Sequence, residues 1–585
     1  MLKVTDLSYE FPQKDLYHKI SFSIEDGQHC VLIGTNGTGK STLIRILAHP
    51  DEYLYDGKIE MEANQRIGFV NQFLNLADDE DCSVFSYIKE PFDIQQKKID
   101  DICKEMEAGE NIEALMEQYQ EAWDLFTAMD GDNCEVNIKK QLKLAGLEKL
   151  ENLKMTELSG GECKLIEIIR QMLVKPSLLI MDEPDAFLDF ENVNALRDLI
   201  NAHKGTLLVI THNRYLLNYC FDKVLHLENK ELQEFDGNYT AYHYLMLQTK
   251  IEQTQLAAAD MEEIERNRKL VEKLRRNATR FDNASLGKAL HARVSLLERL
   301  ENRKTRSPFI EIPHPQIVLH TDAAVDEVEQ PVLKVEDYEV RFDELLLEHV
   351  SFELAATDKV AIVGGNGTGK TTLLREIYRR QNPAIAVAAD TDVAYLSQMQ
   401  GETMDEQQSV WEAMEQVGME KEDEAAAYLL TYGLPKEILE QKIHALSGGE
   451  KNLLQLAILS LGNASLLLMD EPTSHLDLYA QEALEEAMAA YNGAVLMVSH
   501  DFYTIANCVD YVLYVEDKTV RKVSARKFRK MIYANHFDKD YLELEKKKKE
   551  LEGRIYQALA KDDPKTAEQL SEKLADVIGK MDQKI

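Results

Sequence analysis

Two copies of a glycine-rich octapeptide carry the clearest chemistry in this sequence. GTNGTGKS occupies residues 34–41 and GGNGTGKT occupies residues 364–371, so both fit the pattern GxxxxGK followed by Ser or Thr. Each copy follows an apolar, strand-like run and precedes a helical pattern, which is the context this motif requires. The glycines let backbone N–H groups close around phosphate oxygens, and the helix N-terminus adds its positive dipole. The sequence therefore predicts two phosphate loops.

Each loop is predicted to bind a nucleoside triphosphate with Mg²⁺. Lys40 and Lys370 supply a positive charge for the β- and γ-phosphates, and Ser41 and Thr371 can ligate the metal. The other loop residues predicted to contact the nucleotide are Gly34, Thr35, Asn36, Gly37, Thr38, Gly39, Thr42, Gly364, Gly365, Asn366, Gly367, Thr368, Gly369 and Thr372.

Acidic pairs follow two apolar strands further along the chain. Asp182 and Asp470 end these strands, where they can hold Mg²⁺ through water. Glu183 and Glu471 come next, and a carboxylate beside the γ-phosphate can polarise the attacking water. An Asp-Glu pair alone could also be a helix N-cap cluster, but the phosphate loops upstream favour the catalytic interpretation.

Histidines and glutamines recur at matching places. His212 and His500, here called the switch histidines, each follow an apolar strand by the same offset from the acidic pairs, which favours a γ-phosphate contact over a structural role. Gln72 and Gln398 each follow a short strand and are predicted to sense Mg²⁺ and the water. Phe11 and Phe342 precede the two loops; either could stack on adenine, and core packing is an equal alternative.

The spacing of these motifs makes the chain an internal repeat. LSGGE, here called the signature, occurs at 158–162 and at 446–450. In both halves 23 residues separate the signature serine from the strand-ending aspartate, and 30 residues separate that aspartate from the histidine. Equal spacings predict two copies of one fold. The first copy carries about 38 extra residues within 73–157, including a helical pattern at 112–126, which is either a tolerated surface insertion or a docking arm.

The combination of phosphate loop, signature, acidic pair and switch histidine resembles the nucleotide-binding domains of the ATP-binding cassette superfamily. In that family two domains form a head-to-tail sandwich, and each ATP lies between the phosphate loop of one domain and the signature of the other. By that resemblance, the loop of Lys40 would face Ser447, Gly448 and Gly449. The loop of Lys370 would face Ser159, Gly160 and Gly161.

Between the copies, the apolar spacings predict a hairpin of two long helices, the first over 243–275 with a length of ~50 Å and a turn near 277–285. Prolines within 307–316 end the second helix. Another charged helical pair is expected over about 537–585, broken at Asp562-Asp563-Pro564.

Charge is distributed unevenly along the 585 residues. Lys and Arg number 67 against 103 Asp and Glu, a net charge of −36 that argues against nucleic-acid binding by the whole surface. Yet residues 266–306 hold 13 basic and four acidic side chains, so this segment is +9 and the rest of the chain is −45. A salt-bridged helical face is one interpretation, and an RNA contact is the favoured one. The predicted RNA contacts are Arg275, Arg276, Arg280, Lys288 and Arg293. The smaller basic run at 546–549 is interpreted as a solvated helix face.

Other compartments are disfavoured by the composition. No apolar run approaches the ~18 residues of a membrane helix, and the first nine residues lack the pattern of a secretory signal. The seven cysteines are scattered without a CxxC pair, which favours a reduced, cytoplasmic setting.

Two cassettes without membrane helices, an insertion in the first and a helical linker together resemble the ABC-F family. FDGNYTAY at 235–242 also fits that family. The expected fold is α/β, with two P-loop nucleotide-binding domains in tandem (1–240 and 332–536), a basic helical hairpin linker (241–331) and a helical C-terminal extension (537–585). The resemblance implies a monomeric, Mg-dependent ATPase that binds the ribosomal E site. Its linker would contact P-site tRNA and 23S rRNA, either to protect ribosomes from antibiotics or to tune translation and relieve stalls.

Several positions depart from the family pattern. The first D-loop, EPDAFLD at 183–189, has Asp185 and Phe187 where Thr and His are usual. Asn213 replaces the Asp that follows the switch histidine, and Leu165 and Leu453 stand where the signature helices usually carry Arg. We expect both sites to hydrolyse ATP, at different rates. The alternatives are an ATPase subunit of a transporter with a separate membrane chain and, more remotely, a DNA-associated cassette ATPase.

Overall fold

The structure is a computed structural model of the 585-residue chain. It describes all residues except 12–13, 62–65, 73–81, 108–111, 187, 281–293, 295–314, 322–330, 343–344, 399–400, 402, 529–538, 562 and 583–585. The chain divides into two compact units. The first comprises Met1–Asn238 and Ile312–Arg529, and the second comprises Tyr239–Glu311 and Lys530–Ile585.

The first cassette contains a mostly parallel sheet of six strands. Its order is β5 (Ile67–Val70), β6 (Leu178–Asp182), β7 (Thr206–Ile210), β3 (His29–Ile33), β8 (Lys223–Glu228) and β9 (Glu231–Asp236), of which only β9 is antiparallel. The central strands are continuous apolar runs because helices cover both of their faces. A second, antiparallel sheet has the order β2 (Lys14–Ile24), β1 (Leu2–Phe11) and β4 (Asp56–Met61). The cassette's helices include α1 (Lys40–Ala48), α5 (Gly160–Leu173), α6 (Phe190–Ala202) and α7 (Arg214–Tyr219).

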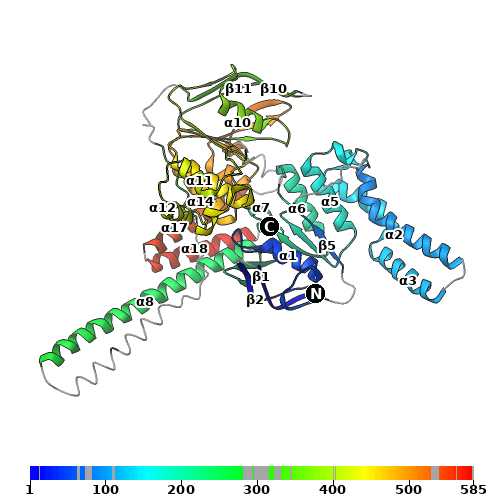
Figure 1. The fold of residues 1–585 in the computed structure, drawn as a ribbon, viewed down its shortest axis with the longest axis horizontal. Helices are drawn as coiled ribbons and strands as arrows, with labels where there is room; N and C mark the ends of the chain where they lie inside the picture. The colour runs from blue at the N-terminus through cyan, green and yellow to red at the C-terminus, as the bar shows by residue number, and fades with distance from the viewer. Residues whose placement is uncertain are drawn as a thin grey trace. The chain divides into compact units, whose positions relative to one another are not determined.

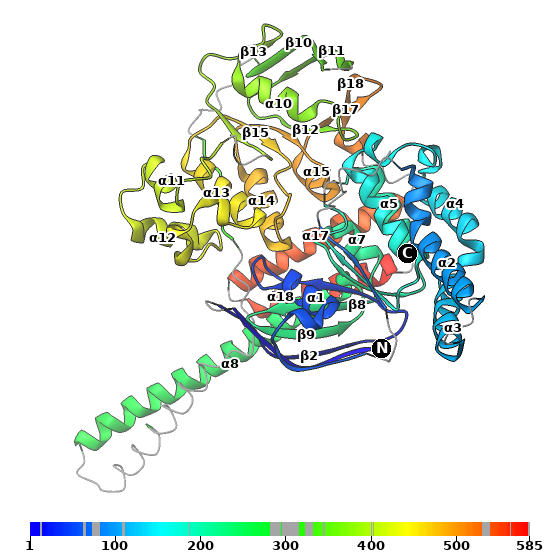
Figure 2. The same ribbon diagram turned by 45° about the vertical axis from the view of Figure 1, so that its right-hand side comes forward.

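The second cassette repeats this plan. Its mostly parallel sheet has the order β14 (Val393–Leu396), β15 (Leu466–Asp470), β16 (Ala494–Val498), β12 (Lys359–Val363), β17 (Tyr511–Glu516) and β18 (Thr519–Ser524), of which β18 is antiparallel. Its antiparallel sheet has the order β11 (Leu345–Leu354), β10 (Leu333–Arg341) and β13 (Ile385–Val387). Helix α10 (Lys370–Arg379) lies between the two sheets, and its Leu373, Leu374 and Ile377 pack into one core with both (Figures 1 and 2). The remaining helices are α11 (Val410–Gln416), α12 (Glu422–Thr431), α13 (Gly448–Leu461), α14 (Leu478–Ala490) and α15 (Phe502–Cys508).

The insertion of the first cassette is helical. The stretch that contains the extra residues forms α2 (Val84–Glu107), α3 (Ile112–Ala128) and α4 (Cys134–Leu144). Helices α2 and α3 pack together through a small core that includes Ile99, Leu115 and Phe126. The helical pattern at 112–126 therefore corresponds to α3.

The second unit is built from long helices. Helix α8 (Tyr239–Arg280) packs against α18 (Pro564–Asp582), which packs in turn against α17 (Lys539–Ala560). Ile251, Ile555 and Leu574 are buried here, and His243 lies 3.3 Å from the Glu552 carboxylate. Pro564 opens α18, since a helix tolerates proline in its first turn, where the missing N–H has no intrahelical acceptor.

The predicted fold class is confirmed: two tandem P-loop α/β domains with a helical C-terminal extension. One detail differs, because α8 continues to Arg280 through the first part of the expected turn at 277–285. Asn277, Ala278 and Thr279 contain no helix breaker, so the helix runs through them. The expected second linker helix lies outside the described residues. None of the described helices is long and apolar enough to span a membrane.

Candidate functional site

Both phosphate loops connect a buried parallel strand to a helix with an open N-terminus. β3 leads into α1 and β12 leads into α10, with Gly39 and Gly369 as the N-cap residues. Both glycines have positive φ, 96° and 90°, and neither helix has a side-chain cap. Their first N–H groups are thus available to a phosphate, and the helix dipole favours its negative charge.

The loop lysines are buried and held by their own loops. Lys40 Nζ donates to the carbonyl oxygens of Gly34 and Thr35 at 2.9 Å each. Lys370 Nζ donates to those of Gly364 and Gly365 at 2.9 and 2.6 Å. Burial lowers the pKa of both lysines, because it penalises the charged form. A triphosphate supplies the opposite charge that two such buried ammonium groups need.

Hydroxyl and carboxylate oxygens meet beside each loop. Ser41 Oγ donates to Asp182 Oδ1 at 3.2 Å, and Thr371 Oγ1 donates to Asp470 Oδ1 at 3.0 Å. Both aspartates are buried at the carboxyl ends of parallel strands, and burial raises the pKa of Asp182. Hard oxygen donors of this kind are the ligands that Mg²⁺ takes, usually together with waters and phosphates. The donor set therefore fits Mg²⁺ bound with a nucleotide.

Glu183 and Glu471 occupy strained and partly buried positions. Their φ angles are 44° and 48°, in the left-handed region that costs a non-glycine residue free energy. Their amides donate to the carbonyl oxygens of Ile210 and Val498 at 2.9 Å, which ties each glutamate to the neighbouring strand. Burial first, with nearby aspartates, raises the pKa of Glu183 to about 7 and that of Glu471 to about 8. A carboxylate with a pKa near neutrality is suited to act as a general base.

The predicted sensor Gln72 and the switch histidine His500 each contact one of these glutamates. Gln72 Nε2 donates to Glu183 Oε2 at 2.5 Å, and the His500 amide donates to Glu471 Oε2 at 3.3 Å. Burial lowers the pKa of His500 to about 3 and that of His212 well below its ordinary value, so both rings are neutral. Among the described residues, neither ring nitrogen of His212 has a hydrogen-bond partner. A buried imidazole left in this way can donate to a phosphate oxygen.

The signature segments begin helices α5 and α13. Ser159 and Ser447 are the N-cap residues, and each forms a capping box with a glutamate three residues later. Gly160, Gly161, Gly448 and Gly449 form the first helical turns, so their amides point out of the helix N-terminus.

Each phosphate loop contacts the D-loop of the other cassette. The Asn36 amide donates to Asp477 Oδ2 at 3.0 Å, and Asn36 Nδ2 donates to the His475 carbonyl at 2.8 Å. In the opposite direction, the Asn366 amide lies 3.3 Å from Asp189 Oδ2. A Cβ added to Gly449 would lie only 2.2 Å from Asn36 Nδ2, so the signature is also close to the facing loop. These contacts place the loop of one cassette against the signature side of the other.

A cavity of about 620 Å³ lies at the second phosphate loop. Its walls include Asn366–Thr372, Gln398, Glu471 and His500 from the second cassette, and Gly160, Gly161 and His212 from the first. Phe342 also lines it and is 66% exposed, which agrees with an open stacking surface more than with core packing. The side chain of Phe11, its predicted counterpart, lies outside the described residues.

Sequence reasoning assigned no role to the D-loop aspartates. Asp189 and Asp477 each cap the helix that follows and also reach the facing phosphate loop. Their shared position in EPDAFLD and EPTSHLD was the signal available, but pairing across cassettes is invisible in a linear sequence.

The unusual Asp185 is partly buried and accepts a hydrogen bond from Thr211 Oγ1 at 2.6 Å. Its charge is opposed by buried Lys164, whose Nζ donates to the carbonyl oxygens of Asn71 and Gln72. The second cassette has Asn452 and Thr473 at these positions. The first site thus has a basic and an acidic side chain where the second has two neutral ones. Phe187, the other departure in this loop, lies outside the described residues.

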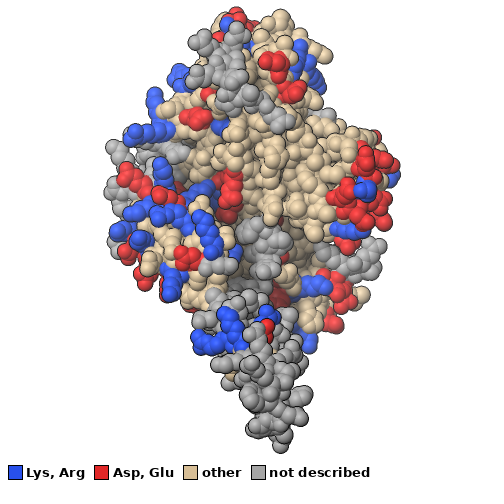
Figure 3. Space-filling model, turned by 90° about the vertical axis from the view of Figure 1, so that its left-hand side faces the viewer, with Lys and Arg blue, Asp and Glu red and all other residues tan. Residues whose placement is uncertain are grey.

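The structure describes only the backbone of some of the predicted RNA contacts. Arg275, Arg276 and Arg280 belong to α8, but their side chains are not described, and Lys288 and Arg293 lie outside the described residues. Further back on α8, Arg266, Arg268 and Lys269 are exposed. Figure 3 shows blue side chains towards the lower end of the view. The basic character of the described part of the linker is therefore at the surface.

We expect Glu471→Gln to stabilise the nucleotide-free protein at pH 8. Burial favours the protonated carboxyl, so its folded-state pKa of about 8 exceeds the ordinary 4.5 and folding becomes costlier as pH rises between these values. The neutral amide avoids that cost. The unfolding free energy should rise by at least about 1 kcal/mol at pH 8. One pKa unit corresponds to about 1.4 kcal/mol, and the pKa of Glu471 is raised by more than one unit.

The effect is measured as the midpoint of thermal unfolding between pH 4.5 and 8. The stabilisation should vanish at the acidic end, where the wild-type carboxyl is protonated in both states. Glu440→Gln, at an exposed position of the same cassette, is the matched control and should show no such trend. A Glu471→Gln protein with the same pH dependence as wild type would contradict the raised pKa.

Comparison with known proteins supports the same chemistry. Residues 17–186 and 347–474 match the family described as ABC transporter, and residues 225–312 match a second family of that description. The energy-dependent translational throttle protein EttA of Escherichia coli (strain K12) is 28% identical over 523 residues, covering 87% of this chain and 90% of that protein. ABC transporter F family member 2 of Arabidopsis thaliana is 27% identical over 541 residues, covering 88% and 76%.

The fold is also found among solved structures. A chain in a model of ribosome-bound archaeal Pelota and ABCE1 superposes with a TM-score of 0.52 at 17% identity, covering 92% of this chain and 82% of that chain. The matched family segments contain both phosphate loops, both signatures and both acidic pairs. The protein is accordingly an ATPase that converts ATP and water to ADP and phosphate with Mg²⁺. The chain belongs to the ATP-binding cassette family and, within it, to the ABC-F proteins.

Proposed function

We propose that this ABC-F ATPase binds the ribosome when ATP has closed its two cassettes and leaves after hydrolysis. The observation that carries the proposal is the reciprocal contact of each phosphate loop with the other cassette, Asn36 with Asp477 and Asn366 with Asp189. A nucleotide bound between such halves bridges them, so binding and hydrolysis change how the cassettes are held together. That change can present or withdraw a surface elsewhere in the chain.

The predicted site residues take the roles that the sequence suggested. The two loops and the facing signatures bind ATP. Asp182, Asp470, Ser41 and Thr371 hold Mg²⁺, with Gln72 and Gln398 nearby, and Glu183 and Glu471 activate water. The strained backbone and raised pKa of both glutamates support this assignment. His212 and His500 contact the γ-phosphate.

The linker is the proposed RNA-binding element. Its net charge of +9 stands against −45 for the rest of the chain, so phosphate attraction is confined to one segment. We propose that the protein occupies the E site of a cytoplasmic ribosome, with the linker towards P-site tRNA and 23S rRNA near the peptidyl-transferase centre. The name of the relative EttA, an energy-dependent translational throttle protein, supports a role in translation.

Four functional segments follow from this proposal. They are the cassettes at 1–240 and 332–536, the linker at 241–331 and the C-terminal helices at 537–585. The protein acts as a monomer, since one chain holds both halves of each site. Its task is ribosome protection or stall relief; the linker turn is short and polar, with Phe281 as its aromatic residue, and does not separate the two.

The Glu183→Gln, Glu471→Gln double variant should trap the ATP-bound complex. Glutamine keeps the shape of the side chain but cannot accept a proton, so turnover should fall by about 100-fold or more while ATP binding persists. In sucrose gradients of lysate the variant should co-migrate with ribosomes in ATP and not in ADP. The control is Glu437→Gln with Glu440→Gln, two exposed positions of the second cassette. Migration with membranes or DNA instead would favour the transporter or DNA-associated alternatives.

Reversing the linker charge should weaken ribosome binding. Arg275→Glu, Arg276→Glu and Arg280→Glu replace three cations. Each lost phosphate contact should reduce the slope of log K against log salt concentration by about one. ATP binding by the purified variant should stay at the wild-type level. Lys546→Glu, Lys547→Glu and Lys549→Glu, on exposed positions of α17, make an equal charge change elsewhere. Equal weakening by both triple variants would contradict a specific role for the linker.

Expression of the protein should raise the inhibitory concentration of drugs that bind near the peptidyl-transferase centre. Lincosamides, pleuromutilins and streptogramins are compared in otherwise identical strains with and without the gene, and with the double glutamine variant as the inactive control. An unchanged inhibitory concentration for every class would reject ribosome protection and favour stall relief.

A further inference from the structure

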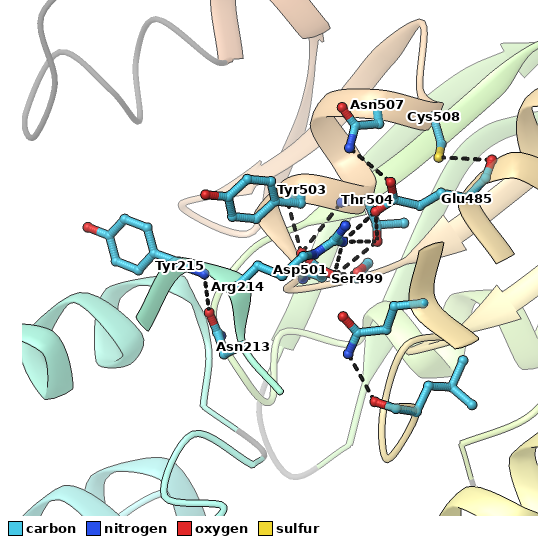
Figure 4. Close-up of polar contacts among 12 residues, drawn as sticks. Asn213, Arg214, Tyr215, Glu485, Ser499, Asp501, Tyr503, Thr504, Asn507 and Cys508 are labelled. Atoms are coloured by element: carbon cyan, nitrogen blue, oxygen red, sulfur yellow. Dashed lines mark hydrogen bonds and ion pairs between the residues drawn. The ribbon is translucent and has the colours of Figure 1, made fainter. Parts of the chain in front are cut away.

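Two short helices that follow the switch histidines meet across the cassettes. In the first cassette His212 and Asn213 lead into α7, and in the second His500 and Asp501 lead into α15. Asn213 and Asp501 are the N-cap residues. The side chain of each accepts hydrogen bonds from the backbone amides two and three residues later. Figure 4 shows Arg214, the first residue of α7, extending into the second cassette.

The guanidinium of Arg214 is surrounded by groups of the second cassette. Its Nη2 donates to Glu485 Oε1 on α14 and, at 3.0 Å, to Asp501 Oδ2. Its Cζ lies 4.9 Å from the ring centre of Tyr503. Arg214 is 8% exposed and Glu485 is 4% exposed, so these charges depend on each other rather than on water.

Asp501 connects this ion pair to the catalytic glutamate. While Oδ2 accepts from Arg214, Oδ1 accepts from the Tyr503 amide at 2.8 Å, and the Asp501 amide donates to Ser499 Oγ at 3.0 Å. These contacts fix the backbone on both sides of His500. The His500 amide in turn donates to Glu471 Oε2, and His500 Nε2 lies 3.5 Å from Glu471 Oε1. Two contacts therefore connect Arg214 to the carboxylate of Glu471. Arg214 contacts Asp501, and the preceding residue, His500, contacts Glu471.

The reverse connection is absent from the described residues. Phe502 takes the place of Arg214 in the second cassette, and its ring packs on Phe190 at 6.3 Å. Neutral Asn213 takes the place of Asp501. Arg197 takes the place of Glu485, since each precedes its switch histidine by 15 residues, and it pairs with Asp198 and Tyr215 of its own cassette. One cassette therefore donates the cation and the other supplies both carboxylates.

We propose that Arg214 is a positioning residue through which the first cassette sets the activity of the second nucleotide site. The ion pair holds the segment of His500 in place against Glu471, and it joins that segment to the residue two places after His212. A movement of the first switch segment, when its own site binds or releases phosphate, is therefore passed to the second site. The same network gives the first site no equivalent control from the second.

The test measures each site alone and rests on the proposed roles of Glu183 and Glu471. Glu183→Gln leaves the second site to turn over, and Glu471→Gln leaves the first. Arg214→Met in the Glu183→Gln background should lower kcat by about 10- to 100-fold, since misplacing a catalytic group by about 1 Å can cost about 100-fold. KM for ATP should change little, because no phosphate-binding group is removed. In the Glu471→Gln background the same change should leave kcat near its starting value.

Matched variants separate positioning from general damage. Arg197→Met removes a similar, partly buried arginine that stays within the first cassette, and should spare the second site. Arg214→Lys keeps a buried charge in case Arg214→Met folds poorly, and should show a smaller loss at the second site alone. Arg214→Glu combined with Glu485→Arg restores an ion pair in reverse, and should recover part of the lost kcat.

Equal losses in both backgrounds, or no loss in either, would overturn the role of Arg214. So would a loss of second-site turnover with Arg197→Met as large as that with Arg214→Met. Turnover that persists in the Glu183→Gln, Glu471→Gln double variant would overturn the glutamate assignment, and with it this proposal. The two failures are therefore distinguishable by the double variant alone.

Discussion

Neither nucleotide site is complete within one cassette, and this constraint organises the rest of the molecule. Asp477 reaches the amide of Asn36, and Asp189 reaches that of Asn366. Each aspartate also caps its own helix, so the same side chain anchors one cassette and touches the other. A helix cap is among the least mobile positions for a carboxylate, because backbone amides hold it in one orientation. The interface is therefore built from groups that each cassette has already fixed.

Burial disfavours the charged forms of the lysines and glutamates at both nucleotide sites, and ATP with Mg²⁺ supplies charges that offset this effect. The loop lysines have lowered pKa values, and Glu183 and Glu471 have raised ones, which means that burial outweighs the opposite charges that the protein places near each group. A metal–triphosphate complex brings charges of both signs to the same place. The structure is thus poised for its ligand, and part of the binding free energy is the relief of charge burial.

The sequence was sufficient for the motifs and their repetition. The loops, signatures, acidic pairs and histidines lie where β-strand ends and helix starts were predicted, because short motifs such as GxxxxGK impose their own local geometry. Helix α3 was readable from its apolar spacing. The end of α8 was not, since its last residues neither favour nor forbid a turn.

What the sequence could not supply was pairing between distant segments. Arg214 and Glu485 are 271 residues apart, and nothing in RYLLN or in ALEEAM marks them as partners. Lys164 and Asp185 are likewise not recognisable as opposed charges until the fold brings them together. Asp185 was recognised as a departure, but its charge could be interpreted only once Thr211 and Lys164 were seen beside it.

The unequal interface has a consequence for how freely the two halves can be exchanged. A duplicated domain that met its twin through identical surfaces could be replaced by any relative with the same surface. Here the first half carries an arginine that only the second half can satisfy, and the second half carries two carboxylates that need that arginine. A chimera that joined the first half to a partner without Glu485 and Asp501 would bury an uncompensated cation. The halves therefore form a matched pair and are not interchangeable modules.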